Sequence, residues 1–354
     1  MKTWKAKVIG AGGYGGVGII ELLLRHPHVE LACLVAKDET GMPVSKIYPH
    51  LEGFCDMMVH GPDSPEAAQP ADIVFFSTPD RVGMKSAGAE LARGAKVIDY
   101  SGDFRFNDAA LYAEYARRIG LDTTHLAPDL LPASTYGLPE LGLSSHASAR
   151  IVGNPGCFAV SCLLGAAPAA KLGLVRPGSF IFDCKTGISG AGKKPNPSFH
   201  YPARYDQMNA YRLTGHQHVC EVEQNLAKLA GLADYPVTFT AQAMPATRGI
   251  LTVCYADLND GLDAAKVMEA YREFYRGRTF VKLYDRTAAI GTAQVRGSNF
   301  CKLIVDVDVR TRKLRIVSHI DNLMKGQAGS ALQNMNLLLG LPEDTALNFP
   351  GNYP

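Results

Sequence analysis

The chain has 354 residues, of which 47% are hydrophobic and 20% charged, and its formal net charge is +2. This length is more than one ordinary core needs, so two domains are expected. The small net charge and the lack of a dense lysine–arginine run argue against a nucleic-acid partner. The longest weakly polar stretch, residues 157–170, is too short to span a membrane and contains a glycine and a proline. No membrane partner is therefore expected.

The start of the chain and its cysteines indicate where the protein works. A strand is expected from about residue 6, which leaves no room for a signal peptide. The eight cysteines are scattered and include no Cys-x-x-Cys pair, so free thiols and no structural metal site are expected. These features predict a cytoplasmic protein.

Residues 1–155 alternate between strand and helix patterns. Apolar strand stretches occur at 29–36 and 71–79, and residues 91–101 contain the end of a helix followed by another strand. Alternation at this spacing predicts an α/β fold with a Rossmann-type, doubly wound parallel sheet.

After about residue 155 the pattern changes to longer strands. They occur within residues 178–190, 235–258 and 299–321, several of them joined in hairpin fashion. Residues 156–325 are therefore predicted to form a second, α+β domain with a mixed or antiparallel sheet. The last helix follows this sheet, and residues 326–354 are expected to pack back on the first domain.

A glycine-rich turn lies where the first strand passes into the first helix. Glycines there allow a tight turn and let the backbone approach a dinucleotide pyrophosphate, whose charge meets the free N–H groups of the helix start. The competing interpretation is a turn needed only for close helix packing. The residues assigned to cofactor binding in this turn are Gly10, Gly12, Gly13, Tyr14, Gly15 and Gly16.

The end of the second strand bears on the choice of dinucleotide. An acidic residue there usually holds the ribose 2′-hydroxyl of NAD, whereas a cation suits the 2′-phosphate of NADP. In this chain Lys37 comes first and Asp38 follows. NADP(H) is therefore favoured, although Lys37 could also be a solvated loop residue.

Cys157 directly follows an Asn-Pro-Gly turn and begins an apolar run with helical character up to Pro168. A buried cysteine is commonly a small hydrophobic side chain. At a helix N-terminus, however, the dipole and the free N–H groups would lower the pKa of the thiol and could stabilise an oxyanion. The position favours a nucleophile.

A nucleophilic thiolate generally needs an acid–base partner, and His216 and His218 precede a clear helix. If the chain is extended there, a spacing of two directs the side chains to opposite sides, and only one would face Cys157. A metal site with Cys220 or Glu221 is less favoured, because no distant pair of ligands completes a recognisable set.

Two further stretches suit the binding of anions. The loop around Ser189 and Gly190 follows a strand and is rich in glycine, so its backbone N–H groups could face an oxyanion or phosphate. Arg105 lies near the end of a first-domain strand, and its guanidinium could bind phosphate or carboxylate in a bidentate manner. Either stretch could instead be a surface loop.

Taken together, these stretches resemble the N-acetyl-γ-glutamyl-phosphate reductase family, a relative of aspartate-semialdehyde dehydrogenase. The matching stretches occur in family order along essentially the whole chain. They are GAGGYGG at 10–16, DYSGDFRF at 99–106, YGLPEL at 136–141, GNPGC at 153–157, TGISGAGK at 186–193, GHQHVCEVEQ at 215–224, PATRGIL at 245–251 and DNLMKGQAGSALQNMN at 321–336.

The resemblance implies a function and an assembly. The expected reaction is the NADPH-dependent reductive dephosphorylation of N-acetyl-γ-glutamyl phosphate to N-acetylglutamate semialdehyde, through a thioester, in arginine biosynthesis. It also implies a second domain like that of glyceraldehyde-3-phosphate dehydrogenase and a homodimer or homotetramer.

The resemblance also implies roles for individual residues. Cys157 would be the nucleophile, and His216 the likelier acid–base of the histidine pair. Arg105 and the loop that contains Ser189 and Gly190 match stretches around the substrate and its phosphate. Asn322 falls where the family is expected to contact the nicotinamide end of NADP.

The chain departs from the family pattern beside the site. Phe158-Ala159-Val160 replace the usual Tyr-Pro-Thr, Gln217 stands where arginine is common, Cys220 where proline is common, and Asp80 where histidine is often found. The reaction type survives these changes. A related acyl phosphate, such as carrier-linked aminoadipyl phosphate in lysine biosynthesis, and a non-catalytic nucleotide-binding relative remain open.

Overall fold

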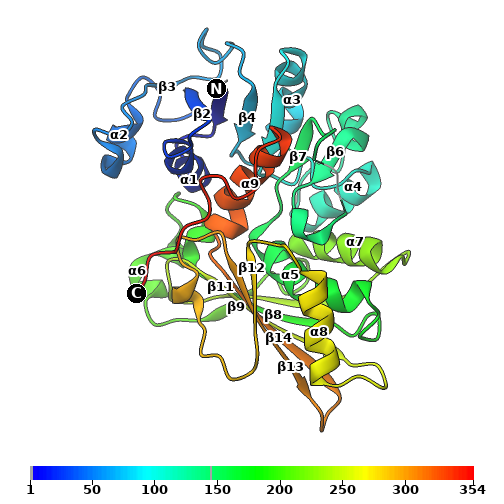
Figure 1. Ribbon diagram of the computed structural model, residues 1–354. Coiled ribbons are helices and arrows are strands. Elements are labelled where there is room, and N and C mark those ends of the chain that lie inside the picture. Colours follow the sequence, from blue (N-terminus) through cyan, green and yellow to red (C-terminus); the bar gives the residue numbers. More distant parts are fainter. Residues whose placement is uncertain (1–2, 144–145) are drawn as a thin grey trace.

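The computed structural model describes residues 3–143 and 146–354, which form two seven-stranded sheets (Figure 1). The first sheet has the order β3-β2-β1-β4-β5-β7-β6, and all of its strand pairs are parallel. This confirms the Rossmann-type prediction. Its strands are β1 Trp4–Ile9, β2 Val29–Val35, β3 Val59–His60, β4 Ile73–Phe76, β5 Lys96–Asp99, β6 Ser134–Tyr136 and β7 Ile151–Gly153.

The crossover helices of this domain follow from local sequence signals. α1 (Tyr14–Leu23) buries an apolar face against the sheet, and Asp108 caps α4 (Ala109–Arg118) by accepting from the N–H groups of Ala110 and Leu111 at 2.8 and 3.1 Å. The remaining helical segments of the domain are α2 Val44–Ile47, α3 Gly83–Ala92, η1 Pro49–Leu51, η2 Pro128–Ala133 and η3 Pro139–Leu141.

The second sheet has the order β12-β13-β14-β11-β8-β10-β9 and is mixed, as predicted. β13 and β14 form an antiparallel hairpin, but β10 and β11 do not, because β8 lies between them. Its strands are β8 Ile181–Thr186, β9 Asn209–Tyr211, β10 Thr238–Ala243, β11 Ile250–Asp257, β12 Val281–Tyr284, β13 Cys301–Asp308 and β14 Lys313–Ile320.

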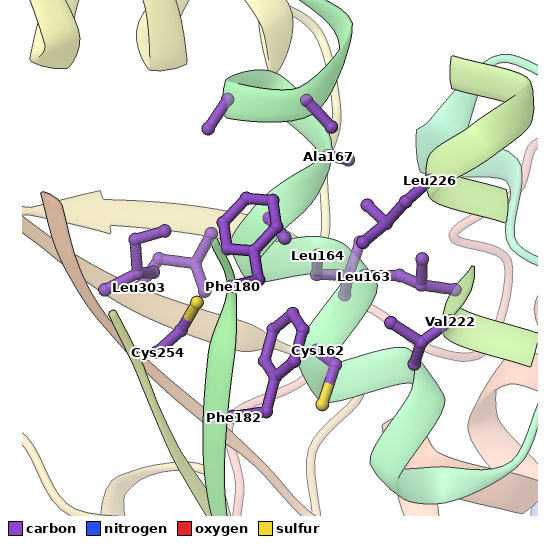
Figure 2. Packing of buried hydrophobic residues seen from close by; sticks show 14 of the residues in the cluster. Cys162, Leu163, Leu164, Ala167, Phe180, Phe182, Val222, Leu226, Cys254 and Leu303 are labelled. Atoms are coloured by element: carbon purple, nitrogen blue, oxygen red, sulfur yellow. The ribbon is translucent and has the colours of Figure 1, made fainter. Parts of the chain in front are cut away.

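The helix that begins at the candidate nucleophile, α5 (Cys157–Lys171), is the centre of the second core. Leu163 and Leu164 pack with Phe180 and Phe182 and with α7 residues (Figure 2). The other helical segments here are α6 Tyr201–Arg204, α7 His218–Ala230, α8 Ala264–Phe274, η4 Ile188–Ala191, η5 Pro197–Phe199 and η6 Thr292–Gln294.

The expectation that this helix ends near Pro168 is wrong, since α5 continues to Lys171. A proline lacks the N–H that would bond to the carbonyl four residues earlier, which here belongs to Leu164. The Tyr275 hydroxyl donates a hydrogen bond to that carbonyl, so the freed acceptor is satisfied inside the core. Burial and this tertiary partner keep the helix intact past the proline.

The end of the chain returns to the first domain. β14 is followed by a π-helical segment, η7 (Met324–Ala328), and by α9 (Gly329–Leu338). Leu332 and Met335 of α9 belong to the same buried cluster as Ile20 of α1, and α9 lies beside α1 in Figure 1. Within the described parts of the chain, no helix combines the length and apolar character that a membrane crossing needs.

Candidate active site

The glycine turn forms a cradle that side chains could not occupy. Gly10 has φ +93°, and a Cβ on it would lie 2.1 Å from the Ser77 carbonyl oxygen. A Cβ on Gly16 would lie 2.2 Å from the carbonyl oxygen of Gly10. α1 begins at Tyr14 after Gly13, which has no side chain to cap the first-turn N–H groups. The turn therefore leaves free backbone donors for an anion.

Two cavities meet at Cys157. A cavity of about 300 Å³ is lined by the glycine turn, Cys157 and residues of both domains. A second cavity, of about 580 Å³, lies on the side of the second sheet and includes both histidines. The predicted site residues on the first are Gly13, Tyr14, Gly15, Arg105, Cys157, Ser189, Gly190 and Asn322; those on the second are Cys157, Gly190 and His216. Lys37 lies apart from both, exposed beyond the end of β2.

Cys157 is the first residue of α5 and is partly exposed. Gly156 cannot cap the helix with a side chain, and the N–H groups of Cys157 and Phe158 act on the thiol and favour its anion. Gly326 of η7 packs so closely that a Cβ there would lie 2.7 Å from Cys157 Cβ. Burial raises the pKa of the Cys157 thiol to about 11, although the Phe158 N–H and the Arg105 charge oppose this. The prediction of a lowered pKa is therefore wrong, and the thiol needs a base.

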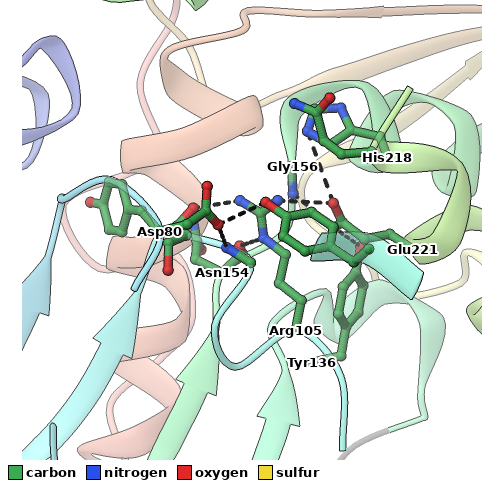
Figure 3. Close-up of polar contacts among 12 residues, drawn as sticks. Asp80, Arg105, Tyr136, Asn154, Gly156, His218 and Glu221 are labelled. Atoms are coloured by element: carbon green, nitrogen blue, oxygen red, sulfur yellow. Dashed lines mark hydrogen bonds and ion pairs between the residues drawn. The ribbon is translucent and has the colours of Figure 1, made fainter. Parts of the chain in front are cut away.

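A buried ion pair supports the turn ahead of this cysteine (Figure 3). Glu221 of α7, with 0% of its side chain exposed, bonds to Arg105, which is 8% exposed, at 2.9 Å. The other carboxylate oxygen accepts from the Gly156 N–H and the Tyr136 hydroxyl, each at 3.0 Å. Arg105 also donates to the Asn154 carbonyl at 2.8 Å. Two domains are thereby joined at the Asn-Pro-Gly turn.

Arg105 is thus engaged in hydrogen bonds within the chain. Its third hydrogen bond goes to the Tyr100 carbonyl, so three of the five N–H groups of the guanidinium are used. The substrate contact expected of Arg105 depends on the two that remain, and it stays a prediction.

The prediction that His216 and His218 face opposite sides is wrong. Their ring centroids lie 4.8 Å apart. Gln217 between them has φ −59° and ψ −32°, which is helical rather than extended, so the chain turns and brings both rings together. His216 Nδ1 accepts the His218 N–H at 3.2 Å, which leaves the proton of the neutral His216 ring on Nε2.

The two rings differ in their surroundings. His218 lies against Gly156, where a Cβ would be 2.2 Å from His218 Nε2, and this nitrogen is 3.9 Å from Glu221. His218 Nδ1 is buried without a hydrogen-bond partner among the described residues. Burial and the Arg212 charge lower the pKa of His216 to about 3, and burial and His216 lower that of His218. Both rings are therefore neutral at pH 7.

The residues that depart from the family pattern after Cys157 are buried in α5. Phe158 packs its ring edge-on against His216 and His218, with centroids 5.5 and 6.1 Å away. Its buried ring thereby forms part of the wall against which both imidazoles pack. Asp80 is also occupied: it accepts from the Gly102 N–H and the Tyr115 hydroxyl at 2.7 and 2.8 Å.

Asn322 and Ser189 are bonded to each other. The Asn322 amide donates to the Ser189 hydroxyl at 2.9 Å and accepts the Gly249 N–H at 2.8 Å. Asn322 thereby joins three loops at the carboxyl ends of second-domain strands. Its expected nicotinamide contact uses the amide N–H that remains, and this also stays a prediction.

Glu221 is the site residue that sequence reasoning missed. It was considered only as a metal ligand, whereas the structure gives it the role of an anion between Arg105 and Gly156. No residue group in the described parts of the chain could hold a metal ion. The sequence offered one signal for this residue: Glu221 follows His218 by three positions, so both lie on one face of the predicted helix.

The chain matches the two domain families of the semialdehyde dehydrogenases. Residues 5–149 match the semialdehyde dehydrogenase NAD binding domain, and residues 157–322 match the semialdehyde dehydrogenase dimerisation domain. The solved structure of aspartate semialdehyde dehydrogenase II from Vibrio cholerae covers 96% of this chain and 99% of its own, with TM-score 0.72 and 17% identity. These matches define the class as a two-domain protein of the semialdehyde dehydrogenase type.

Relatives with higher sequence identity to this chain show which family within this class it belongs to. N-acetyl-gamma-glutamyl-phosphate reductase from Symbiobacterium thermophilum is 42% identical over 98% of this chain and 97% of its own length. The protein of the same name from Desulforudis audaxviator is 39% identical over 99% of both chains. The chain belongs to the N-acetyl-gamma-glutamyl-phosphate reductase family.

Proposed function

We propose that this protein reduces N-acetyl-γ-glutamyl phosphate to N-acetylglutamate semialdehyde with NADPH, releasing inorganic phosphate, in arginine biosynthesis. The observation that carries the proposal is the position of Cys157. Its thiol lies at a helix N-terminus between the glycine cradle and the cavity that holds both histidines. Full-length relatives of that name support the choice of substrate.

The first step is acyl transfer to the cysteine. The Cys157 thiolate attacks the γ-acyl carbon, the carbon–oxygen bond to phosphate breaks, and a thioester and inorganic phosphate result. Because burial holds the pKa of the thiol at about 11, a base must take its proton. The first-turn N–H groups of α5 supply donors for the oxyanion that forms on the acyl oxygen. Ser189 and Gly190, which line the same smaller cavity, are assigned to the substrate and its phosphate.

The second step reduces the thioester. NADPH, when bound, supplies the hydride for the thioester carbon. The tetrahedral oxyanion then collapses, the carbon–sulfur bond breaks, and the semialdehyde leaves while the sulfur regains its proton. Holding the acyl group on Cys157 keeps the reacting carbon fixed between the two cavities, which contributes proximity and orientation.

We assign the proton transfers to His216. Its ring lines the same cavity as Cys157 and is neutral. Because Nδ1 accepts the His218 N–H and Nε2 carries the proton, the ring must release that hydrogen bond before it accepts the thiol proton on Nδ1. His218 lies against Gly156 and near Glu221, which suits it to holding the turn in place. Its unpartnered Nδ1 makes it the second candidate for the acid–base role.

The residues present fit a dinucleotide. The cradle at Gly10, Gly12, Gly13, Gly15 and Gly16 is closed to side chains at several points, and α1 leaves its first N–H groups for the pyrophosphate. We assign Tyr14 and Asn322 to the nicotinamide side, because both line the smaller cavity with Cys157. Lys37 is assigned to the 2′-phosphate by its position after β2. We also propose a cytoplasmic homodimer or homotetramer, for which the match to a dimerisation domain gives support.

The test is the reverse reaction. The protein is incubated with N-acetylglutamate semialdehyde, NADP and inorganic phosphate, and formation of NADPH is followed at its absorbance. We expect reduction of NADP that depends on both aldehyde and phosphate. Activity with another semialdehyde but none with this one would overturn the substrate assignment, and reduction without phosphate would overturn the acyl-phosphate chemistry.

A further inference from the structure

A lysine of the second domain reaches the glycine cradle of the first. Lys193 follows η4 in the loop after β8, and its Nζ bonds to both carboxylate oxygens of Glu39, at 2.8 and 2.6 Å. Glu39 lies in the loop after β2, so the ion pair crosses from one domain to the other. Lys193 and Tyr14 of the cradle also line one cavity of about 940 Å³.

The ion pair lies against the turn itself. A Cβ on Gly12 would be 2.7 Å from a Glu39 carboxylate oxygen and 3.8 Å from Lys193 Nζ. Tyr48 fixes the same place, since its hydroxyl donates to the Gly12 carbonyl at 2.8 Å and its ring lies 5.5 Å from the Lys193 ammonium. A carboxylate and an ammonium therefore occupy space that a dinucleotide must enter.

The two charges have opposite effects on such a ligand. A dinucleotide phosphate is repelled by the Glu39 carboxylate and attracted by the Lys193 ammonium. Glu39 is moreover held with φ +61°, a left-handed conformation that is uncommon for residues other than glycine. Glu39 and Lys193 both lie in exposed loops, so the pair can separate when a phosphate competes for the ammonium.

We propose that Lys193 is a cofactor-binding residue that the second domain supplies, and that it exchanges Glu39 for a phosphate group of the dinucleotide. Glu39 holds the ammonium beside Gly12 and partly blocks the cradle. When cofactor binds, the ammonium pairs with phosphate and ties the two domains together over it. The phosphate is the pyrophosphate near Gly12 or the ribose 2′-phosphate near the loop after β2.

This inference rests on the proposed use of a dinucleotide, and it is tested by binding without substrate. Dissociation constants of NADPH and NADH are measured by fluorescence for the wild type, Lys193→Met, Lys193→Arg and Glu39→Gln. Lys171→Met, at the exposed end of α5, loses the same charge away from the cleft and serves as the matched control. Thermal unfolding of each ligand-free variant checks that it is folded.

We expect Lys193→Met to weaken NADPH binding by about 10-fold or more, the usual scale for a charge-assisted hydrogen bond. Lys193→Arg should restore most of the affinity, and Glu39→Gln should bind NADPH more tightly than the wild type. Equal losses of affinity for NADPH and NADH would identify the pyrophosphate as the partner of Lys193. A loss of affinity for NADPH alone would identify the 2′-phosphate. The proposal is overturned if Lys193→Met and Lys171→Met bind both dinucleotides alike. Because no substrate is present, failure of the reductase reaction would leave this result unaffected.

Discussion

Replacing Glu221 with glutamine tests whether the buried ion pair holds the turn that carries the nucleophile. The carboxylate accepts hydrogen bonds from Arg105, from the Gly156 N–H and from the Tyr136 hydroxyl, and its side chain is 0% exposed. A glutamine keeps the shape but leaves the Arg105 charge buried without its counter-ion. Breaking one side of such a pair costs about 3–5 kcal/mol of folding free energy.

A double-mutant cycle separates the pair from its neighbours. We expect Glu221→Gln and Arg105→Met each to destabilise the protein by about 3 kcal/mol or more, because each leaves a buried charge unpaired. The double variant should lose less than the sum, by about 0.5–3 kcal/mol, the usual range for residues in contact. Urea unfolding followed by circular dichroism provides the measurement.

The control is an ion pair on the surface. Glu269 and Arg272 lie 3.8 Å apart on α8, with 69% and 65% of their side chains exposed, so Glu269→Gln should leave the unfolding curve almost unchanged. Unfolding of Glu221→Gln at the wild-type urea concentration, or single losses that simply add, would refute a supporting role for the ion pair. A lower kcat in Glu221→Gln with unchanged stability would show that Glu221 takes part in the reaction and does not stabilise the turn.

Four further outcomes are expected. Cys157→Ser should abolish turnover while leaving the NADPH dissociation constant close to that of the wild type; more than a few per cent of kcat would exclude a covalent role for this thiol. His216→Asn should lower kcat by roughly 10²–10⁴-fold, the usual size of a general acid–base contribution, and His218→Asn by less; reversed magnitudes would transfer the role to His218. The free energy of unfolding should fall as the pH drops from about 6.5 towards 3, because His216 takes up a proton in the unfolded state but not in the folded state, where its pKa is lowered to about 3. Urea midpoints measured across this range should fall less steeply in His216→Asn than in the wild type. The same slope in both proteins would contradict the buried neutral ring. Lys37→Asp should lower the ratio of kcat/KM for NADPH over NADH, and an unchanged ratio would show that another cation binds the 2′-phosphate.

The features that sequence reasoning predicted are those with a strong local pattern. Alternating strands and helices predicted the parallel sheet because each crossover is local in the chain. Glycine spacing after β1 predicted the cradle, since a turn with φ +93° at Gly10 favours glycine. The position of Cys157 at a helix start followed from the Asn-Pro-Gly turn before it.

The features that sequence reasoning missed depend on contacts between segments that are distant in the chain. The helical conformation of Gln217 brings the two histidine rings together, and an extended chain was assumed in its place. The carbonyl left free by Pro168 is satisfied by Tyr275, more than one hundred residues further along. Glu221 acts through Arg105 and Gly156, and only the folded chain shows that these residues meet.

The thiol was expected to be acidic because a helix start favours an anion. Burial outweighs that effect and raises the pKa of Cys157 to about 11. This balance depends on how closely segments distant in the chain, such as η7 at Gly326, pack around Cys157, and no local sequence pattern reports it. It also explains why the proposed reaction needs a neutral base beside the cysteine.

Trapping the acyl-enzyme tests the central claim most directly. The protein is mixed with N-acetyl-γ-glutamyl phosphate in the absence of any dinucleotide, quenched in acid, digested and analysed by mass spectrometry, while released phosphate is measured in parallel. We expect an N-acetylglutamyl group on the peptide that contains Cys157, together with about one phosphate per active site, and neither in Cys157→Ser. An acyl group on another residue, or turnover with NADPH without any such adduct, would contradict the account.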